Sequence, residues 1–259
     1  MMKHLYIRHI IVFFLVFSHL FLFGQDDDAR DIFVRATDQL LTENLELVMD
    51  MKVTDNKGRV KEKGYEIIMT RFGDVLKTKM SWLKPEQAKG TTVVFTEKQG
   101  ETGLVEVFTP SNGKIRKLKA TQANMDRVGS EMQVTNLTAR DPDDLAFMVL
   151  PPREVDGNNC YTVVVKDNDF KDQARGELLI EMDSYRIVRI AVFDMYGKQV
   201  SSVKLSDFQA VPGTRDKIQP MRIVSEDLRN QKISDMQVLK IASRTDLTES
   251  DFELPRESK

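Results

Sequence analysis

Apolar and polar residues alternate along much of this chain with a period of two, the pattern of β-strands that have one buried face. The segment 45–53 shows it most clearly, because every second residue from Leu45 to Val53 is apolar. Residues 55–58 follow as a hairpin turn in which Gly58 is free to adopt a positive φ. Short turns of this kind between alternating segments predict an antiparallel sheet of up-and-down topology.

The same pattern predicts about eleven strands, in one group between residues 45 and 119 and another between residues 160 and 241. There is no alternation of strands with long helices and no exact internal repeat. So many strands with so few helices favour one large curved sheet. We therefore expect a mainly β fold, a single incomplete (unclosed) antiparallel β-barrel.

Two segments depart from this alternation. Residues 29–41 have the spacing of an amphipathic helix, with Ile32, Phe33, Ala36 and Leu40 on one face. Residues 108–150 separate the two groups of strands, and 141–144 read as a helix start with an N-cap acid followed by proline. We expect an N-terminal helix and a central helical lid, which together cover an apolar cavity.

The first 24 residues read as a secretory signal peptide. A basic start precedes an apolar run, residues 10–23, and an acidic stretch begins after Gly24. The alternative, a membrane anchor, is disfavoured because the run is shorter than the roughly 20 residues that a spanning helix needs. The sequence predicts cleavage near Gly24, a periplasmic location, and one domain over residues 25–259.

Composition narrows the chemistry. The three histidines all lie in the leader, so the exported chain has no imidazole for Ser-His-Asp or Cys-His catalysis or for most zinc sites. Cys160 is the single cysteine, and a net charge of −2 gives no sign of nucleic-acid binding. Paired carboxylates could still serve a hydrolase. We expect a protein that is not an enzyme, has no cofactor or catalytic residue, and binds no metal.

The candidate ligand-binding residues are apolar side chains predicted to line the cavity. Their alternative role is ordinary core packing, which is the commoner fate of inward methionines. The candidate lid residues come from the central segment, and two basic residues are either solvated strand charges or contacts for a lipid headgroup or an acidic partner. The lining is Leu47, Met49, Met51, Ile67, Met69, Met80, Trp82, Phe95, Leu104 and Phe108; the lid is Phe147, Met148 and Leu150; the basic pair is Arg116 and Lys117.

Short segments in a characteristic order also carry a family resemblance. They include the proline-serine turn at 108–111, the basic strand at 115–118 and the closing segment 247–252. The others are residues 89–91, 129–130, 144–145, 156–157, 160–161, 194–198, 205–208 and 220–223. In these segments the chain resembles the LolA-like outer-membrane lipoprotein-sorting proteins.

The resemblance implies a periplasmic carrier that holds the acyl chains of lipoproteins, or lipids, in a hydrophobic cavity and shuttles them towards the outer membrane. Its implied partners are the acylated cargo, an inner-membrane release complex and an outer-membrane acceptor, and the carrier itself would be a monomer. A second hypothesis is a periplasmic sensor of envelope stress that binds lipid or lipoprotein on the same scaffold. An exported carboxylate-dependent hydrolase is a distant third.

Overall fold

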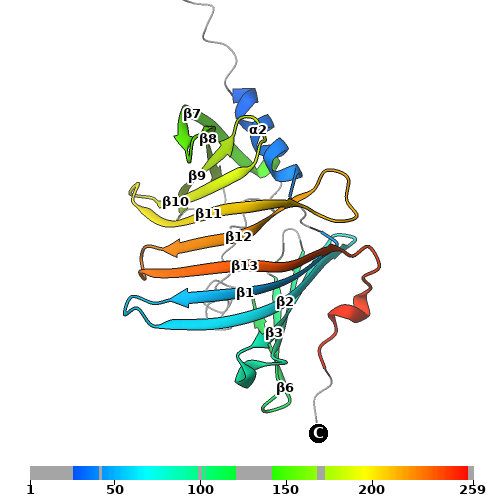
Figure 1. Ribbon diagram of the computed structural model, residues 1–259. Coiled ribbons are helices and arrows are strands. Elements are labelled where there is room, and N and C mark those ends of the chain that lie inside the picture. The colour runs from blue at the N-terminus through cyan, green and yellow to red at the C-terminus, as the bar shows by residue number, and fades with distance from the viewer. Residues whose placement is uncertain are drawn as a thin grey trace, which may run out of the picture.

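The computed structural model describes residues 26–40, 43–98, 101, 103–120, 142–167 and 173–255. One antiparallel sheet dominates this part of the chain (Figure 1). Its strands are β1 (Leu45–Thr54), β2 (Val60–Phe72), β3 (Val75–Lys84), β4 (Thr92–Lys98), β5 (Leu104–Thr109), β6 (Lys114–Lys119), β7 (Leu145–Val155), β8 (Asn158–Asp167), β9 (Gln173–Glu181), β10 (Ile187–Asp194), β11 (Gln199–Ala210), β12 (Ile218–Asp227) and β13 (Lys232–Ser243).

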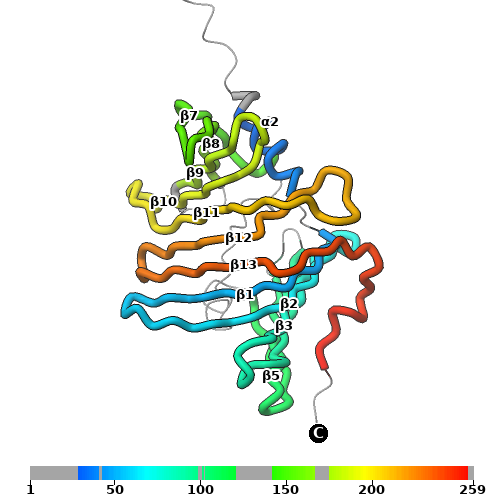
Figure 2. The backbone as a smooth tube through the Cα atoms, in the orientation of Figure 1, coloured from blue at the N-terminus to red at the C-terminus, as the bar shows by residue number. Residues whose placement is uncertain are grey.

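The sheet is unclosed. Its strand order is β6-β5-β4-β3-β2-β1-β13-β12-β11-β10-β9-β8-β7, so β6 and β7 are the two edges and β1 and β13 meet in the middle. Each half is an up-and-down meander, and the tube trace in Figure 2 follows the two meanders from the central pair outwards. The predicted mainly β architecture with an unclosed antiparallel sheet is therefore confirmed.

The strand count differs from the expectation, with thirteen strands in place of about eleven. The clearest addition is β7, because its first six residues were expected to form the lid helix. The predicted helix is wrong for residues 142–150: Pro142–Asp144 form one 3-10 turn, and Leu145 begins a strand paired with β8. The rest of the predicted lid, residues 121–141, lies outside the described residues.

Local signals misled the assignment of β7. Asp143 and Asp144 favour a helix start, but the backbone of the following residues gains a ladder with β8, in which Leu145 pairs with Asp167 and Val155 with Asn158. Pro151 and Pro152 fit an edge strand, where a missing N–H costs no ladder bond, and the register shifts beside them. Tertiary pairing here outweighs local propensity.

The predicted N-terminal helix is present as α2 (Asp26–Asp38), three residues earlier than expected. It ends where the chain turns to join the sheet, because Leu40 makes a parallel bridge with Ile218. Its apolar side chains Ile32, Phe33 and Ala36 are buried. They pack beside β7 and β8 at one end of the sheet (Figure 1).

The two faces of the sheet have different roles, and we name them by their residues. The inner face carries the main core, which includes Leu47, Met80, Val163, Leu178 and Met236, and α2 packs on it. The outer face carries the alternate positions, such as Glu46, Lys79 and Glu106, which follow from the pairing registers. The C-terminal segment 244–255, with the 3-10 turn η4 (Glu249–Phe252), lies against this outer face.

No helix in the described ranges combines the length and the apolar character needed to cross a bilayer. Within the same ranges, no group of three or more Cys, Asp or Glu side chains is arranged to hold a metal ion.

Candidate functional site

The inner face of β1–β4 holds eight of the ten predicted lining residues. Cross-strand registers align them in rows, with Leu47 opposite Ile67 and Ile67 opposite Met80. Seven are buried, and Met69 is half-buried against the same cluster. The eight are Leu47, Met49, Met51, Ile67, Met69, Met80, Trp82 and Phe95. The alternating pattern thus placed these residues on one surface.

Leu104 and Phe108 lie on the outer face, in contrast to the expectation. In β5 the inward positions belong to Val105 and Val107, which pair with Phe95 and Val93. Leu104 is 37% exposed. The sequence already indicated this orientation. Glu106 is charged, and it lies two residues from both Leu104 and Phe108, so all three side chains are on the same, solvent-facing side of β5.

The three predicted lid residues divide between the two faces of β7. Phe147 points to the inner side, where its ring lies 5.0 Å from that of Phe33 on α2. Met148 and Leu150 have the opposite parity, and Met148 is 48% exposed. Of these three side chains, only Phe147 is placed to cover the inner face.

Sequence reasoning missed the other half of the inner face. Buried apolar side chains of β8–β13 continue the surface that begins on β1–β4, and Met236 is the register partner of both Met51 and Ile223. The same period of two was visible in these strands and could have identified them. They are Val163, Val165, Leu178, Ile180, Ile187, Ile190, Val203, Leu205, Met221, Ile223, Met236 and Val238.

Two hollows in the described part of the chain lie on the outer face. One of about 510 Å³ lies between β3–β6 and the C-terminal segment, where Lys77, Glu106, Lys117, Glu249 and Phe252 are among its lining residues. A second, of about 250 Å³, lies nearby over β1–β3. Neither opens on the inner face, so the predicted apolar cavity stays a prediction.

The two basic candidates on β6 also point in opposite directions. Lys117 is on the outer face, and its Nζ lies 2.8 Å from Glu106 Oε1; this hydrogen bond raises the pKa of Lys117. Arg116 is the register partner of Val107, so it lies on the inner-face side of β6, and it is exposed at the sheet edge. Arg116 makes no ion pair with another residue that the structure describes.

The C-terminal segment, residues 244–255, forms a strap across the outer face. Lys79 of β3 donates hydrogen bonds from Nζ to the backbone oxygens of Asp251 and Glu253, at 2.7 and 3.1 Å. Phe252 is buried against Phe72, with ring centroids 5.7 Å apart in an edge-to-face arrangement. The strap thus ties the chain end to strands of the first meander.

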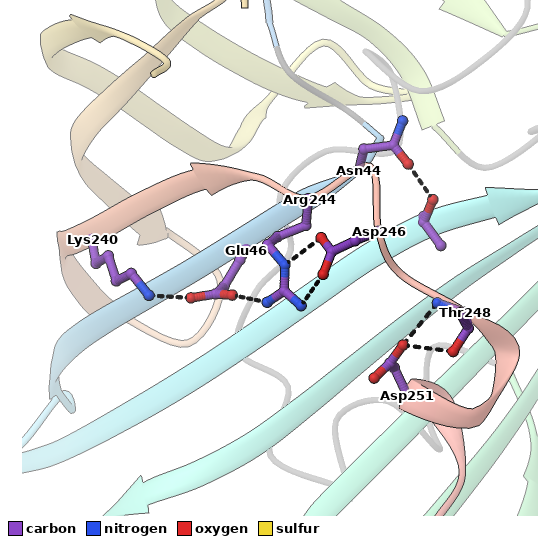
Figure 3. A network of polar contacts seen from close by, with 8 residues as sticks. Asn44, Glu46, Lys240, Arg244, Asp246, Thr248 and Asp251 are labelled. Carbon is purple, nitrogen blue, oxygen red and sulfur yellow. Dashed lines mark hydrogen bonds and ion pairs between the residues drawn. The ribbon is translucent and has the colours of Figure 1, made fainter. Parts of the chain in front are cut away.

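An ion network anchors the start of the strap (Figure 3). Glu46 of β1 is buried and accepts hydrogen bonds from both Lys240 and Arg244, which lower the pKa of its carboxyl. Arg244 also donates to Asp246, from Nε at 2.7 Å and Nη2 at 2.9 Å, and lowers the pKa of that carboxyl. Further along, Asp251 caps η4 by accepting from the backbone N–H of Thr248 at 2.7 Å.

This network predicts a pH-dependent loss of stability in Glu46→Gln. Because the folded pKa of Glu46 is depressed, its ionised form stabilises the protein above the unfolded pKa, and this contribution disappears as the pH falls through the folded pKa. We expect Glu46→Gln to lower the free energy of unfolding by about 1–2 kcal/mol at pH 7, with a smaller difference below about pH 4. Urea denaturation at both pH values measures this.

Glu86→Gln is the control for that comparison, since its pair with Lys89 is largely exposed. We expect a change within about 0.5 kcal/mol. A Glu46→Gln effect that did not depend on pH would contradict the assigned role of the charge.

Cys160 is buried, and burial raises the pKa of its thiol. A raised pKa reduces the thiolate fraction that nucleophilic chemistry requires. Cys160 therefore behaves as a small apolar side chain of β8.

Solved structures with this architecture come from several bacteria. A DUF1329 family protein from Desulfovibrio piger has a TM-score of 0.75 at 15% identity over 89% of this chain and 98% of its own. A domain named as an outer membrane lipoprotein-sorting protein, from Vibrio parahaemolyticus, has a TM-score of 0.73 at 12% identity over 88% and 97%. A LolA superfamily protein from Nitrosomonas europaea has 0.61 at 16% over 87% and 97%.

In sequence, a family model described only as "Uncharacterized protein" matches residues 75–256. The chain belongs to that family, and its fold is LolA-like. The predicted LolA-like resemblance is therefore confirmed. No curated protein matches the chain in sequence. At identities of 12–16%, the LolA-like structures establish the fold alone.

Proposed function

We propose that this LolA-like protein binds acyl chains of lipoproteins or lipids on the inner face of its sheet and carries them through the periplasm towards the outer membrane. The observation that carries the proposal is the continuous apolar inner face of an unclosed sheet. That face runs from Phe95 on one side to Val163 on the other, through the central pair Met51 and Met236. Binding of this kind involves no chemical step and no cofactor.

The energetics favour such a ligand. Each acyl methylene removed from water contributes roughly 0.8 kcal/mol, so a chain of ordinary length can offset a costly opening of the core. The two edge strands, β6 and β7, are not hydrogen-bonded to each other, so the sheet can widen without breaking its ladder. A closed and an open form that differ by a few kcal/mol would suffice for loading and release.

We assign the role of cover to α2 together with Phe147. The contact between Phe33 and Phe147 closes the inner face beside edge strand β7. A polar contact of α2 is the ion pair of Arg30 with Asp143 in the 3-10 turn before β7, and these two side chains are 48% and 76% exposed. Exposed pairs of this kind contribute little, so the apolar face of α2 supplies most of the closing free energy. An acyl chain would replace those contacts when α2 moves away.

We propose that Arg116 contacts an anionic headgroup. It combines inner-face parity with exposure at edge strand β6, so its guanidinium can stay in water while an acyl chain occupies the apolar surface beside it. Lys117, already paired with Glu106 on the other face, is not placed for this contact.

Methionine oxidation tests where a ligand binds, because methionines lie on both surfaces. Met49, Met51, Met80 and Met236 are nearly inaccessible, whereas Met148 and Met195 are 48% and 60% exposed. We expect dilute peroxide to oxidise the exposed pair at least roughly tenfold faster. A bound fatty acid should slow oxidation of the four inner residues by a further factor of about five. Peptide mass spectrometry gives each rate.

Met148 and Met195 serve as internal controls, whose rates should not change with fatty acid. If a fluorescent fatty acid binds but protects only the exposed residues, the ligand is not on the inner face. If no fatty acid binds at all, the carrier proposal fails. If fatty acid does protect the inner methionines, native mass spectrometry of protein purified from its own periplasm would identify the cargo and distinguish acylated protein from free lipid.

The names of two similar structures support a lipoprotein as cargo, since one is an outer membrane lipoprotein-sorting protein domain and another a LolA superfamily protein. For the chain here we propose the same partner classes: acylated lipoproteins, an inner-membrane release complex and an outer-membrane acceptor. Removal of residues 1–24 as a signal peptide is part of this proposal.

A further inference from the structure

Exposed apolar side chains gather at three hairpin tips on one side of the sheet. The tips are residues 54–61 (β1–β2), 194–199 (β10–β11) and 227–233 (β12–β13), which we call the hairpin rim. Figure 1 shows all three tips projecting to the left in that view. Five of the nine exposed large apolar side chains in the described ranges belong to the rim: Val60, Met195, Tyr196, Leu228 and Ile233.

The registers make these side chains neighbours. Thr54 pairs with Val60 on one side and with Ile233 on the other, so the latter two flank it on the same face. The N–H of Leu228 donates to the carbonyl of Val200 at 3.0 Å, which joins the β12–β13 tip to the start of β11. The β10–β11 tip follows directly, with Tyr196 exposed over 86% of its surface. The apolar residues thus form a row along one rim.

The rim is also basic, although the whole chain has a net charge of −2. It contains six basic and three acidic residues, for a net charge of +3. Lys57, Arg59, Lys61, Lys198 and Arg229 are exposed, whereas each acid is half-buried within its own turn. The surface of the rim therefore presents mostly cations, of which Arg59 is paired with Asp55.

Each of the three acids accepts backbone hydrogen bonds at its tip. Asp55 accepts from the N–H groups of Lys57 and Arg59, at 2.9 and 3.0 Å. Asp194 accepts from Tyr196 and Lys198, both at 3.0 Å. Asp227 accepts from Arg229 and Asn230, also at 3.0 Å, which lower the pKa of its carboxyl against the effect of burial. Asp194 and Asp227 thus face the backbone of their own turns, whereas Asp55 is shared between its turn and the guanidinium of Arg59, whose Nη2 lies 2.6 Å from Asp55 Oδ2.

We propose that the hairpin rim docks the protein on the surface of an anionic phospholipid bilayer. Tyrosine is favoured at the boundary between headgroups and acyl chains, and lysine and arginine can extend to the phosphates while their stems lie on apolar surface. Positive charge near the surface is attracted by anionic lipid. A row of exposed apolar tips between cations matches the layered chemistry of a bilayer surface, in which phosphates lie next to acyl chains. The proposal does not rest on acyl-chain binding by the inner face.

Vesicle flotation tests the proposal with the full chain. We expect the protein to bind vesicles of phosphatidylcholine that contain about one third phosphatidylglycerol. Its affinity for vesicles of phosphatidylcholine alone should be lower by roughly tenfold or more. Tyr196→Ser combined with Leu228→Ser should weaken binding to the anionic vesicles by about tenfold. Lys57→Gln combined with Arg229→Gln should weaken it by a similar factor, roughly, at low salt and by much less at about 1 M salt.

Matched controls use exposed residues away from the rim. Leu104→Ser with Met148→Ser removes two other exposed apolar side chains, and Lys166→Gln with Arg189→Gln removes the same charge from β8 and β10. Neither control pair should change vesicle binding. Circular dichroism verifies that every variant keeps its β signal. Equal loss in rim and control variants would overturn the proposal, as would the absence of binding to anionic vesicles. A protein captured through Tyr196 in the absence of vesicle binding would also overturn it.

Discussion

Replacement of Phe33 by alanine is expected to lower the free energy of unfolding by about 3 kcal/mol, at the low end for a phenylalanine removed from a core. Phe33 is 1% exposed and is the largest side chain that α2 contributes to the core. Its ring contact with Phe147 links the helix to edge strand β7. The loss has two parts, the transfer of an aromatic ring and the void left between helix and sheet. Urea denaturation followed by circular dichroism measures it.

Asp31→Ala is the matched change on the exposed side of the same helix, and we expect it to alter stability by no more than about 0.5 kcal/mol. If Phe33→Ala costs less than about 1 kcal/mol, α2 is not a firmly packed cover. The same variant bears on the proposed carrier function. A weaker cover should make the inner methionines easier to oxidise, while Met148 and Met195 keep their rates.

The second large effect is expected for Phe252→Ala, which removes the apolar anchor of the strap. Phe252 is 4% exposed and packs edge-to-face on Phe72. We expect about 3 kcal/mol of destabilisation if the strap unfolds together with the sheet. The remaining ties near this point would include the hydrogen bonds from Lys79 to backbone oxygens of the strap and the ion pair of Lys77 with Glu249. Such bonds contribute less than the buried ring.

Limited proteolysis distinguishes two ways in which Phe252→Ala could affect the structure. Cleavage within residues 244–255 at unchanged urea midpoint would mean that the strap detaches locally and is not part of the cooperative unit. A lowered midpoint without early cleavage would mean that the strap and the sheet unfold together. Leu239→Ala, at a 57% exposed position of β13, is the control and should leave both readouts unchanged.

The strap gives the two faces of the first meander different surroundings. On the inner face, apolar side chains of several strands pack with α2, and the surface is continuous across the sheet. On the outer face, the strap is held over β1–β6 by charges and by one aromatic anchor, and it leaves hollows lined by paired lysines and acids such as Lys117 and Glu106. This contrast favours the inner face as the acyl-binding surface.

Much of the sheet could be predicted because alternation is a local property. The span of β1 was predicted to within one residue, and Gly58 in the following turn has the expected positive φ of 73°. β5 was less certain, because Leu104, Val105, Val107 and Phe108 are apolar on both faces. Which residues of β5 point inward is then indicated by one polar residue, Glu106. Leu104 and Phe108 were expected on the inner face, whereas they lie on the outer face.

β7 marks the limit of such reasoning. Residues 145–150 are apolar at every position, so they show neither the period of a half-buried strand nor that of an amphipathic helix. The acids and proline before them favour a helix start, and a helix was expected. The decisive partner, β8, provides a ladder of backbone hydrogen bonds that local sequence does not reveal.

The sequence by itself determined that this chain forms an up-and-down antiparallel sheet with one apolar face and one amphipathic helix, because side-chain periodicity encodes which face is buried. Tertiary structure alone decided three further features. It made residues 145–155 an edge strand, it laid residues 244–255 across the outer face, and it gathered three distant hairpin tips into one basic, apolar rim. Each of these depends on contacts between residues far apart in the chain, and such contacts leave no periodic signal within the segments that make them.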